Sequence, residues 1–270
     1  MEWTDEALQA VSRVPFFVRK RVKRRVEEET RHEGGKRVTL NDVDRTRKRF
    51  LNKMDTEIRG YQLDGCFGTD ICPHRAVEQA GLMERLEAIL SAADLVAFLR
   101  RHVDGPLKFH HEFRVTISYC PNSCSQPQIK DVGIIGARMP ATTEKACTGC
   151  GACAAACQES AVCLDGDYPV IHTNKCVFCG KCADACPEGV ITDRARGFRI
   201  QLGGKLGRHP LLARELDGIY TMAETAAILE RCLHYYKEHS TQGQRFAEVL
   251  DERNDDLIGE LNDTYGKNKR

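Results

Sequence analysis

Hydrophobic residues in the first part of the chain recur at helical spacing. Valines four residues apart, the spacing of one helix face, predict a helix over Val18, Val22 and Val26. Thr39, with Asp42 three residues later, is typical of a cap that opens the next helix. We therefore expect residues 1–57 to form a small helical module.

Further along, the hydrophobic pattern changes from helical to extended. Apolar residues predict one helix over Val77, Leu82, Leu86, Ile89 and Leu90, and a second over Leu95, Phe98 and Leu99. Residues 113–119 then alternate between apolar and polar, the pattern of a half-buried strand that ends at Cys120. Residues 131–137 and 198–202 are expected as strands and 223–236 as an amphipathic helix, which together predict an α+β fold.

The composition is that of an ordinary water-soluble protein, large enough for two or three compact units. The 270 residues are 41% hydrophobic and 29% charged. No stretch approaches the roughly twenty apolar residues of a membrane span, and residues 1–5 do not resemble a signal peptide. We therefore expect a cytoplasmic protein without a membrane partner.

Positive charge is concentrated at the amino-terminal end. Residues 1–54 hold fifteen Lys and Arg against nine Asp and Glu, or +6, and the remainder holds 25 against 30, or −5. Basic and acidic residues interleave without an aromatic platform for bases, so nucleic acid is not the expected partner. A docking surface for an acidic redox partner fits the pattern better.

Thirteen of the fourteen cysteines fall between Cys66 and Cys186, and eight of them form a repeated run. Both runs have the spacing C-x2-C-x2-C-x3-C, by which bacterial two-cluster ferredoxins hold 4Fe–4S clusters, the fourth cysteine of each run ligating the other cluster. One cluster is therefore expected on Cys147, Cys150, Cys153 and Cys186. The other is expected on Cys176, Cys179, Cys182 and Cys157. A zinc site or a disulfide framework is the alternative, which the doubled run and a reducing compartment disfavour.

The remaining cysteine pairs are spaced differently. Five residues separate Cys66 from Cys72, and three separate Cys120 from Cys124 within Cys-Pro-Asn-Ser-Cys. Together these pairs resemble the siroheme and 4Fe–4S site of the nitrite and sulfite reductase family. Segments 131–136 and 203–210, with Arg245 and Phe246, extend the resemblance over residues 59–140 and 197–270.

The resemblance implies a third 4Fe–4S cluster and a siroheme. The cluster would lie on Cys66, Cys72, Cys120 and Cys124, and the Cys124 sulfur would bridge it to the siroheme iron. A reductase of sulfite or nitrite also needs cations that hold the anion and donate protons. The candidate catalytic residues are Lys205, Arg208 and His209. Cys163 and Cys232 fit no ligand set and are expected as packed structural thiols.

The resemblance also implies a division into three domains. Residues 58–140 and 197–270 would form the reductase-like 4Fe–4S domain, and residues 141–196 an inserted two-cluster ferredoxin domain, as in dissimilatory sulfite reductase subunits. Residues 1–57 resemble the carboxyl-terminal module of a light-independent protochlorophyllide reductase subunit. They do not resemble the half-domain that usually completes the haem pocket, so a partner or a second copy is expected to complete it.

Two functions fit these observations. The first is an iron–sulfur oxidoreductase, or a subunit of one, whose ferredoxin clusters pass electrons to a siroheme-coupled centre that reduces sulfite or nitrite. The alternative is a non-catalytic electron-transfer subunit with three 4Fe–4S clusters and no siroheme, docked on a larger redox complex. Both hypotheses predict a redox partner protein and a homo- or hetero-oligomer.

Overall fold

The computed structural model describes residues 1–66, 72–78, 81–254 and 256–266, which form two compact units. The first unit comprises Met1–Ile58 with Val103–His110, and the second comprises Arg59–His102 with His111–Arg270. None of the helices in the described ranges is long and apolar enough to cross a membrane.

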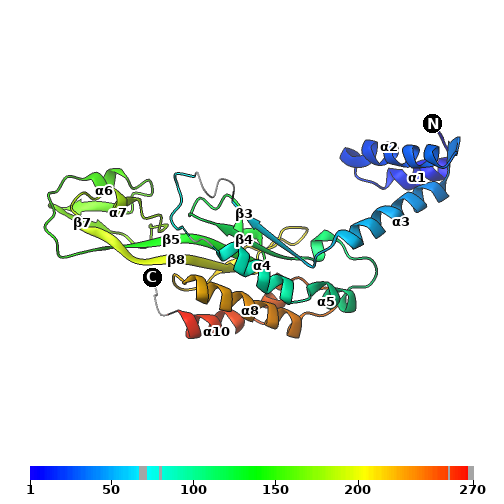
Figure 1. The fold of residues 1–270 in the computed structure, drawn as a ribbon. Helices are drawn as coiled ribbons and strands as arrows, with labels where there is room; N and C mark the ends of the chain where they lie inside the picture. Colours follow the sequence, from blue (N-terminus) through cyan, green and yellow to red (C-terminus); the bar gives the residue numbers. More distant parts are fainter. Residues whose placement is uncertain (67–71, 79–80, 255, 267–270) are drawn as a thin grey trace. The chain divides into compact units, whose positions relative to one another are not determined.

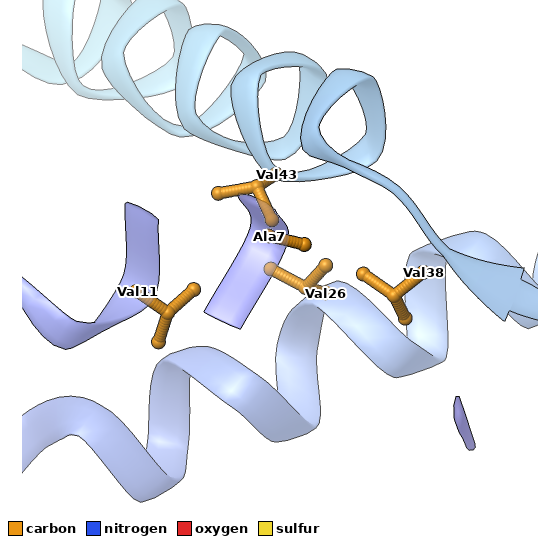
Figure 2. Packing of buried hydrophobic residues seen from close by; sticks show 5 residues of the cluster. All are labelled: Ala7, Val11, Val26, Val38 and Val43. Atoms are coloured by element: carbon orange, nitrogen blue, oxygen red, sulfur yellow. The ribbon is translucent and has the colours of Figure 1, made fainter. Parts of the chain in front are cut away.

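The first unit is a helical module built around a small valine core. Its helices are α1 (Asp5–Ser12), α2 (Phe16–His32) and α3 (Leu40–Glu57), and the short strands β1 (Glu2–Trp3) and β2 (Arg37–Val38) pair in parallel. Figure 2 shows the buried residues of this core, Ala7, Val11, Val26, Val38 and Val43. The helix predicted from the valine spacing is confirmed, and Val26 is its buried contribution to the core.

The cap predicted for the next helix is also present. Thr39 Oγ1 accepts a hydrogen bond from the Asp42 N–H at 3.4 Å, and Asp42 Oδ2 accepts one from the Thr39 N–H at 2.8 Å. This reciprocal capping box satisfies two backbone donors at the start of α3. Thr4 caps α1 through the Ala7 N–H at 3.3 Å.

The second unit is organised around a five-stranded mixed sheet. Its strands, in spatial order, are β3 (Tyr61–Gly65), β4 (Phe113–Ser118), β5 (Val132–Thr142), β8 (Ile191–Leu202) and β9 (Arg214–Glu215). Strands β3, β4 and β5 run parallel, whereas β8 is antiparallel to β5 and to β9. The carboxyl ends of β3 and β4 therefore lie at the same edge of the sheet.

Helices cover one face of this sheet (Figure 1). They are α4 (Leu82–Ala92), α5 (Leu95–His102), α8 (Met222–His239), α9 (Phe246–Glu252) and α10 (Asp256–Tyr265). The Phe113 ring centroid of β4 lies 5.4 Å from that of Tyr236 and 5.3 Å from that of Phe246. Val77 lies outside the helix predicted to contain it, because α4 begins only after Gly81, whose φ of 88° is left-handed. The predicted α+β fold class is confirmed.

Strand β4 is buried on both faces, so its predicted half-buried character is wrong. Thr116 and Ser118, the polar positions of the alternation, are only 0% and 1% exposed. The 3-10 helix η2 (Pro127–Ile129) packs against β4 and β5 and covers the second face. Both hydroxyls are satisfied within this layer, Thr116 by the Asp64 carbonyl at 3.1 Å and Ser118 by Ser125 Oγ at 2.7 Å.

Strands β5 and β8 continue as a long antiparallel ladder that carries residues 143–190. Its register runs from Val132 opposite Leu202 to Thr142 opposite Ile191, with an irregularity between Met139 and Pro140. The carried segment contains α6 (Ala152–Ala155), β6 (Val162–Asp165), β7 (Tyr168–Ile171) and α7 (Lys181–Asp184). Both strands are longer than predicted, so the expected domain boundaries after residues 140 and 196 fall inside β5 and β8.

Candidate metal centre

Two of the predicted ligand cysteines follow the ends of adjacent parallel strands. Cys66 comes directly after β3, and Cys120 comes two residues after β4. The Cys66 N–H donates to the Ile117 carbonyl at 2.9 Å, so the β3–β4 pairing continues up to this cysteine. The parallel ladder thus brings Cys66 and Cys120 to the same edge of the sheet.

The segment after Cys72 is anchored to the end of β4. The Ala76 N–H donates to the Tyr119 carbonyl at 2.9 Å. Gly136 of β5 makes this approach possible, because a Cβ at that position would lie 2.4 Å from the same carbonyl oxygen. The glycine of the family-like segment 131–136 therefore has a packing role: it lets β5 pass directly beneath the cysteine-bearing chain.

The loop from Cys120 to Cys124 turns back onto β4. Ser123 and Gln126 have φ angles of 53° and 58°, in the left-handed region that tight turns use. The Ser125 N–H donates to Ser118 Oγ at 3.3 Å and ties the loop to the strand it leaves. These bonds hold both cysteines of the second pair next to the ends of β3 and β4.

The thiols of Cys66, Cys72, Cys120 and Cys124 are close enough to influence one another. Burial raises the pKa of the Cys120 thiol, and charge on the thiols of Cys72, Cys124 and Cys66 raises it further. Cys120 is buried, Cys66 and Cys72 are half-buried, and Cys124 is exposed. Cys124 is therefore the most exposed residue of this set.

A second group of thiols contains cysteines of the first run of the doubled motif together with the last cysteine of the second run. Burial raises the pKa of Cys153, and charge on Cys186 and Cys147 raises it further. Burial also acts on Cys186, but the backbone N–H groups of residues 188–191 outweigh it and lower the pKa of that thiol. Among them, the Val190 N–H lies 3.2 Å from Cys186 Sγ. Such donors favour the thiolate, the form that binds metal.

The third group of thiols contains the cysteines of the second run together with the last cysteine of the first run. Burial raises the pKa of Cys182 to about 12, and charge on Cys176, Cys179 and Cys157 contributes to the rise. The Ala161 N–H donates to Cys157 Sγ at 3.2 Å. The structure thus brings Cys147 and Cys186 to Cys153. It brings Cys157, Cys176 and Cys179 to Cys182. The ligation of clusters by these cysteines stays a prediction.

The two runs have matching backbone conformations. Gly149 and Phe178, at the same position of their runs, have φ angles of 66° and 62°, and Gly151 and Gly180 have 72° and 77°. A side chain disfavours this left-handed region by roughly 1–2 kcal/mol, so Phe178 requires compensation. Its ring is 1% exposed and packs in a buried cluster with Ala137, Met139 and Ile219.

The donor chemistry of these sets suits cubane clusters. All fourteen cysteines are free thiols, so the disulfide framework is not formed. Among the described residues, no three Cys, His, Asp or Glu side chains stand close enough to share one metal ion. A cubane is wider than a single ion and holds its four thiolates farther apart. Four cysteines per set, backbone N–H donors to sulfur and left-handed turns between ligands all fit such a cluster.

A cavity of about 100 Å³ lies between two of the cysteine sets. One part of its wall belongs to the reductase-like loop and comprises His74, Cys120, Pro121 and Asn122. Another part contains the second group of the doubled run, namely Cys157, Cys176, Cys179 and Cys182. The loop that ends at Cys124 and the Cys182 group therefore face a common space.

The three candidate anion-binding residues have different surroundings. Lys205 is 9% exposed, and its amino group forms an ion pair with Glu248 of α9. Arg208 and His209 are exposed in a loop that closes where Lys205 and Leu211 exchange backbone hydrogen bonds at 2.9 and 3.0 Å. Lys205 is thus held by a carboxylate, and the assignment of all three as substrate ligands stays a prediction.

Two arginines beside the second run were missed from the sequence. Arg138 of β5 donates to both carboxylate oxygens of Asp184 and, through Nε, to Asp193, each at 2.7 Å. Arg199 of β8 holds Glu215 by two bonds of 2.7 Å. An arginine in an alternating strand predicts only a polar face, so no local signal distinguishes these residues. The β5–β8 ladder places both arginines next to the cysteine loops.

The two cysteines outside the sets differ. Cys232 is fully buried in α8, as expected for a structural thiol. The prediction that Cys163 is packed is wrong: it is exposed on β6, with its Sγ 3.3 Å from His172 Nε2. The β6–β7 hairpin is a separate two-stranded sheet with one face open to solvent, which explains the difference.

Comparison with known families agrees with this geometry. The family described as "Nitrite and sulphite reductase 4Fe-4S domain" matches residues 60–254. These residues include every cysteine of the three sets. A second family, described as "Proto-chlorophyllide reductase 57 kD subunit", matches residues 3–47, within the helical module.

The chain is also similar to curated sulfite reductases, of which it spans about a third of the length. It is 33% identical over 208 residues to the Coenzyme F420-dependent sulfite reductase of Methanocaldococcus jannaschii, covering 70% of this chain and 33% of that protein. It is 33% identical over 108 residues to a subunit of the anaerobic sulfite reductase of Salmonella typhimurium, covering 40% and 27%. The solved structure of dissimilatory sulfite reductase I shares the fold, with a TM-score of 0.51 and 14% identity over 74% of this chain and 51% of that one. This protein belongs to the nitrite and sulphite reductase 4Fe-4S domain family.

Proposed function

We propose that this chain is the iron–sulfur and siroheme-binding part of a reductase that acts on sulfite or nitrite. The observation that carries the proposal is the convergence of Cys66, Cys72, Cys120 and Cys124 at one edge of the sheet. The family to which the chain belongs is described by its 4Fe–4S domain, and four thiols in this set supply the ligands of one such cluster.

The exposure of Cys124 supports siroheme binding at this set. Cys120 is buried, whereas Cys124 is exposed, so its sulfur can contact a second iron outside the cluster. When bound, siroheme would supply an iron with an open face at which an oxyanion is reduced. The shared thiolate of Cys124 would give electrons a covalent route to that iron.

Two further clusters on the doubled run would feed electrons toward this centre. The crossed thiol groups and the backbone N–H donors to Cys157 and Cys186 support 4Fe–4S clusters at both positions. The cavity shared by Cys120 and Cys182 supports a transfer route from the second of these clusters to the reductase-like loop. Residues 141–196 would then serve as an internal ferredoxin.

The relatives favour sulfite over nitrite as the substrate. Both curated relatives quoted above are sulfite reductases, and one of them is a subunit. Because residues 3–47 match a different family, we also propose that a partner subunit or a second copy completes the haem pocket. Lys205, Arg208 and His209 are the candidate proton and charge donors on this chain.

The test compares two cysteine variants of the protein, purified anaerobically with any polypeptide that co-purifies with it and supplied with siroheme. Sulfite- or nitrite-dependent oxidation of a reduced dye is measured together with the haem absorption bands. Cys124→Ser should lose the haem bands and the activity but keep the iron of the doubled run. Cys163→Ser, at an exposed cysteine outside the sets, should keep the haem bands and the activity. Iron–sulfur absorbance with no haem bands in the unmodified chain would instead support the non-catalytic electron carrier.

A further inference from the structure

The matching conformations of the two cysteine runs allow their surroundings to be compared position by position. Gly149 of the first run corresponds to Phe178 of the second, and Gly151 corresponds to Gly180. The φ angles agree at both pairs, so the charged side chains beside the two runs can be compared at equivalent places. Those neighbours differ in charge.

A half-buried cation faces the second run. Arg199 Nη1 donates to the Val177 carbonyl at 3.3 Å, and its guanidinium carbon lies 5.9 Å from the centroid of the Phe178 ring. Its other edge, formed by Nε and Nη2, holds Glu215. The guanidinium side chain is 15% exposed. The Arg199–Glu215 pair therefore forms a dipole in a poorly hydrated site, with its positive end toward Val177 and Phe178.

The equivalent place beside the first run carries an anion. A Cβ built on Gly149 would lie 2.7 Å from Asp167 Oδ1, so this carboxylate lies directly against the loop. At the second pair of equivalent positions, Gly180 faces Arg138, whose Nε would lie 2.6 Å from a Cβ, whereas Gly151 faces only the Leu164 side chain at 3.9 Å. At each pair a guanidinium lies beside the second run, whereas the first run has a carboxylate at one position and, among the described residues, no charged group within 4 Å at the other. The first set does have one cation nearby, because a Cβ on Gly189 would lie 3.1 Å from Lys145 Nζ, but this lysine is exposed and its charge is screened.

The charge of Arg138 is more than balanced by two carboxylates, which makes Arg199 the decisive residue. Arg138 is bound by two carboxylates, those of Asp184 and Asp193. Arg199 has one, Glu215, on the edge that points away from the loop. The Arg199 side chain is half-buried, and a charge in such a site acts through a lower effective dielectric than one in water. Arg199 therefore outweighs the exposed Asp167, whose charge is screened.

We infer that Arg199 raises the reduction potential of the cluster site at Cys176, and that Asp167 lowers the reduction potential of the cluster site at Cys147. The potential of an iron–sulfur cluster depends on nearby charge, hydrogen bonds to sulfur and solvent exposure. Reduction adds one negative charge, which Arg199 stabilises at the Cys176 site and Asp167 opposes at the Cys147 site. The Cys176 site is therefore the easier to reduce.

This difference gives the electron path a direction. A one-electron donor of low potential reduces the cluster on the Cys147 set, where Cys150 is exposed. A single electron then passes downhill to the cluster on the Cys176 set, so that the first is oxidised and the second reduced by one charge, with no bond made or broken. The Cys176 set borders the cavity that it shares with Cys120. The inference rests on the two clusters of the proposed function.

The test is a potentiometric titration followed by electron paramagnetic resonance, on the anaerobic holoprotein. Single ligand variants Cys147→Ser and Cys176→Ser identify the two signals. In the unmodified protein the Cys176 site should have the higher potential. Replacing Arg199→Gln together with Glu215→Gln should shift its reduction equilibrium at least tenfold toward the oxidised form, which is 59 mV for one electron, and leave the Cys147 site unchanged.

Three variants complete the test. Arg231→Gln with Glu260→Gln removes a similar bidentate pair between α8 and α10 and should leave both potentials unchanged. Arg199→Lys keeps the cation and should retain most of the higher potential of the Cys176 site. This variant supplies the test if the double variant of Arg199 and Glu215 fails to fold. Asp167→Asn, in an exposed turn, should raise the potential of the Cys147 site and narrow the gap. Equal or reversed potentials in the unmodified protein, or a Cys176 site unaffected by loss of Arg199, overturn the inference.

Failure of the inference about the two potentials can be distinguished from failure of the proposed function. A holoprotein with the expected order of potentials but no siroheme supports the inference and contradicts the proposed function. A holoprotein that binds siroheme but has equal potentials at the two cluster sites supports the proposed function and contradicts the inference. A chain whose doubled run holds no clusters overturns both.

Discussion

Asp131 Oδ2 accepts a hydrogen bond from Arg245 Nη2 at 2.7 Å, and the Asp131 side chain is fully buried. The same oxygen also accepts from the Arg114 N–H of β4 at 2.8 Å. Arg245 immediately precedes α9, so the pair ties this helix to the edge of the sheet just before β5. The carboxylate therefore links three segments that lie far apart in the sequence, at the end of β4 where that strand begins.

Breaking this pair should be costly because it leaves a buried charge without its partner. We expect Arg245→Met to lower the free energy of unfolding by about 3–5 kcal/mol, measured by anaerobic urea denaturation. The exposed arginine Arg208, changed to Met, is the control and should leave stability nearly unchanged. A loss below about 1 kcal/mol for Arg245→Met would mean that the pair behaves like a surface salt bridge.

Phe178 offers a test of backbone strain in the second cysteine run. Removing its buried ring should cost about 3–5 kcal/mol in either Phe178→Ala or Phe178→Gly. Glycine tolerates the φ of 62° and alanine does not, so the glycine variant should be the more stable by about 1 kcal/mol. At Phe113, in strand β4, the usual order should hold, with alanine more stable than glycine. The same order at Phe178 would exclude significant strain there.

The crossed arrangement of ligands predicts which cluster each cysteine supports. Cys157→Ser should remove the signal that Cys176→Ser removes, although Cys157 belongs to the other run. Cys186→Ser should likewise match Cys147→Ser. Each variant should lose about four irons per chain, one cubane, by iron analysis and electron paramagnetic resonance. If Cys157→Ser instead matched Cys147→Ser, each run would hold its own cluster.

The ion pair between α8 and α10 should make the docking of α10 sensitive to acid. Arg231 holds Glu260 by bonds of 2.7 and 2.6 Å, and these hydrogen bonds lower the pKa of Glu260 below its ordinary 4.5. A lowered folded pKa means that the stabilisation is complete above the ordinary value and is lost as the pH falls through the folded value. Amides of α10 should therefore exchange faster in Glu260→Gln than in the unmodified protein at pH 7, and the difference should shrink as the pH falls below 4.5. A difference that is constant with pH would contradict this account.

Local patterns were sufficient to predict much of the fold. The Thr39–Asp42 cap, the leucine spacing of α4 and the alternation in β4 each depend on neighbours within a few residues, and the corresponding elements are present. The burial of Thr116 was not predictable, because η2 covers that face only after the chain has passed through the Cys120–Cys124 loop.

The cysteine sets were predictable for a different reason. Ligand spacing within a run is a local property, so the grouping of Cys153 with Cys186 follows from the motif alone. In the structure Cys186 lies close enough for its charge to act on Cys153. The charges around each run depend on tertiary contacts. Arg199 lies in β8, far along the chain from Cys157, and only the β5–β8 ladder brings it to the second run. Such an electrostatic difference between two equal motifs leaves no trace in their spacing.

The cofactor content of the anaerobically prepared chain tests the central claim most directly. Iron, acid-labile sulfide and extractable siroheme should be counted on one sample that has been supplied with siroheme. We predict about twelve irons and about twelve sulfides per chain, four of each per cluster, with siroheme bound in the unmodified protein and absent from Cys124→Ser. A protein that contains the full iron but takes up no siroheme, even when prepared with any polypeptide that co-purifies with it, would contradict the account.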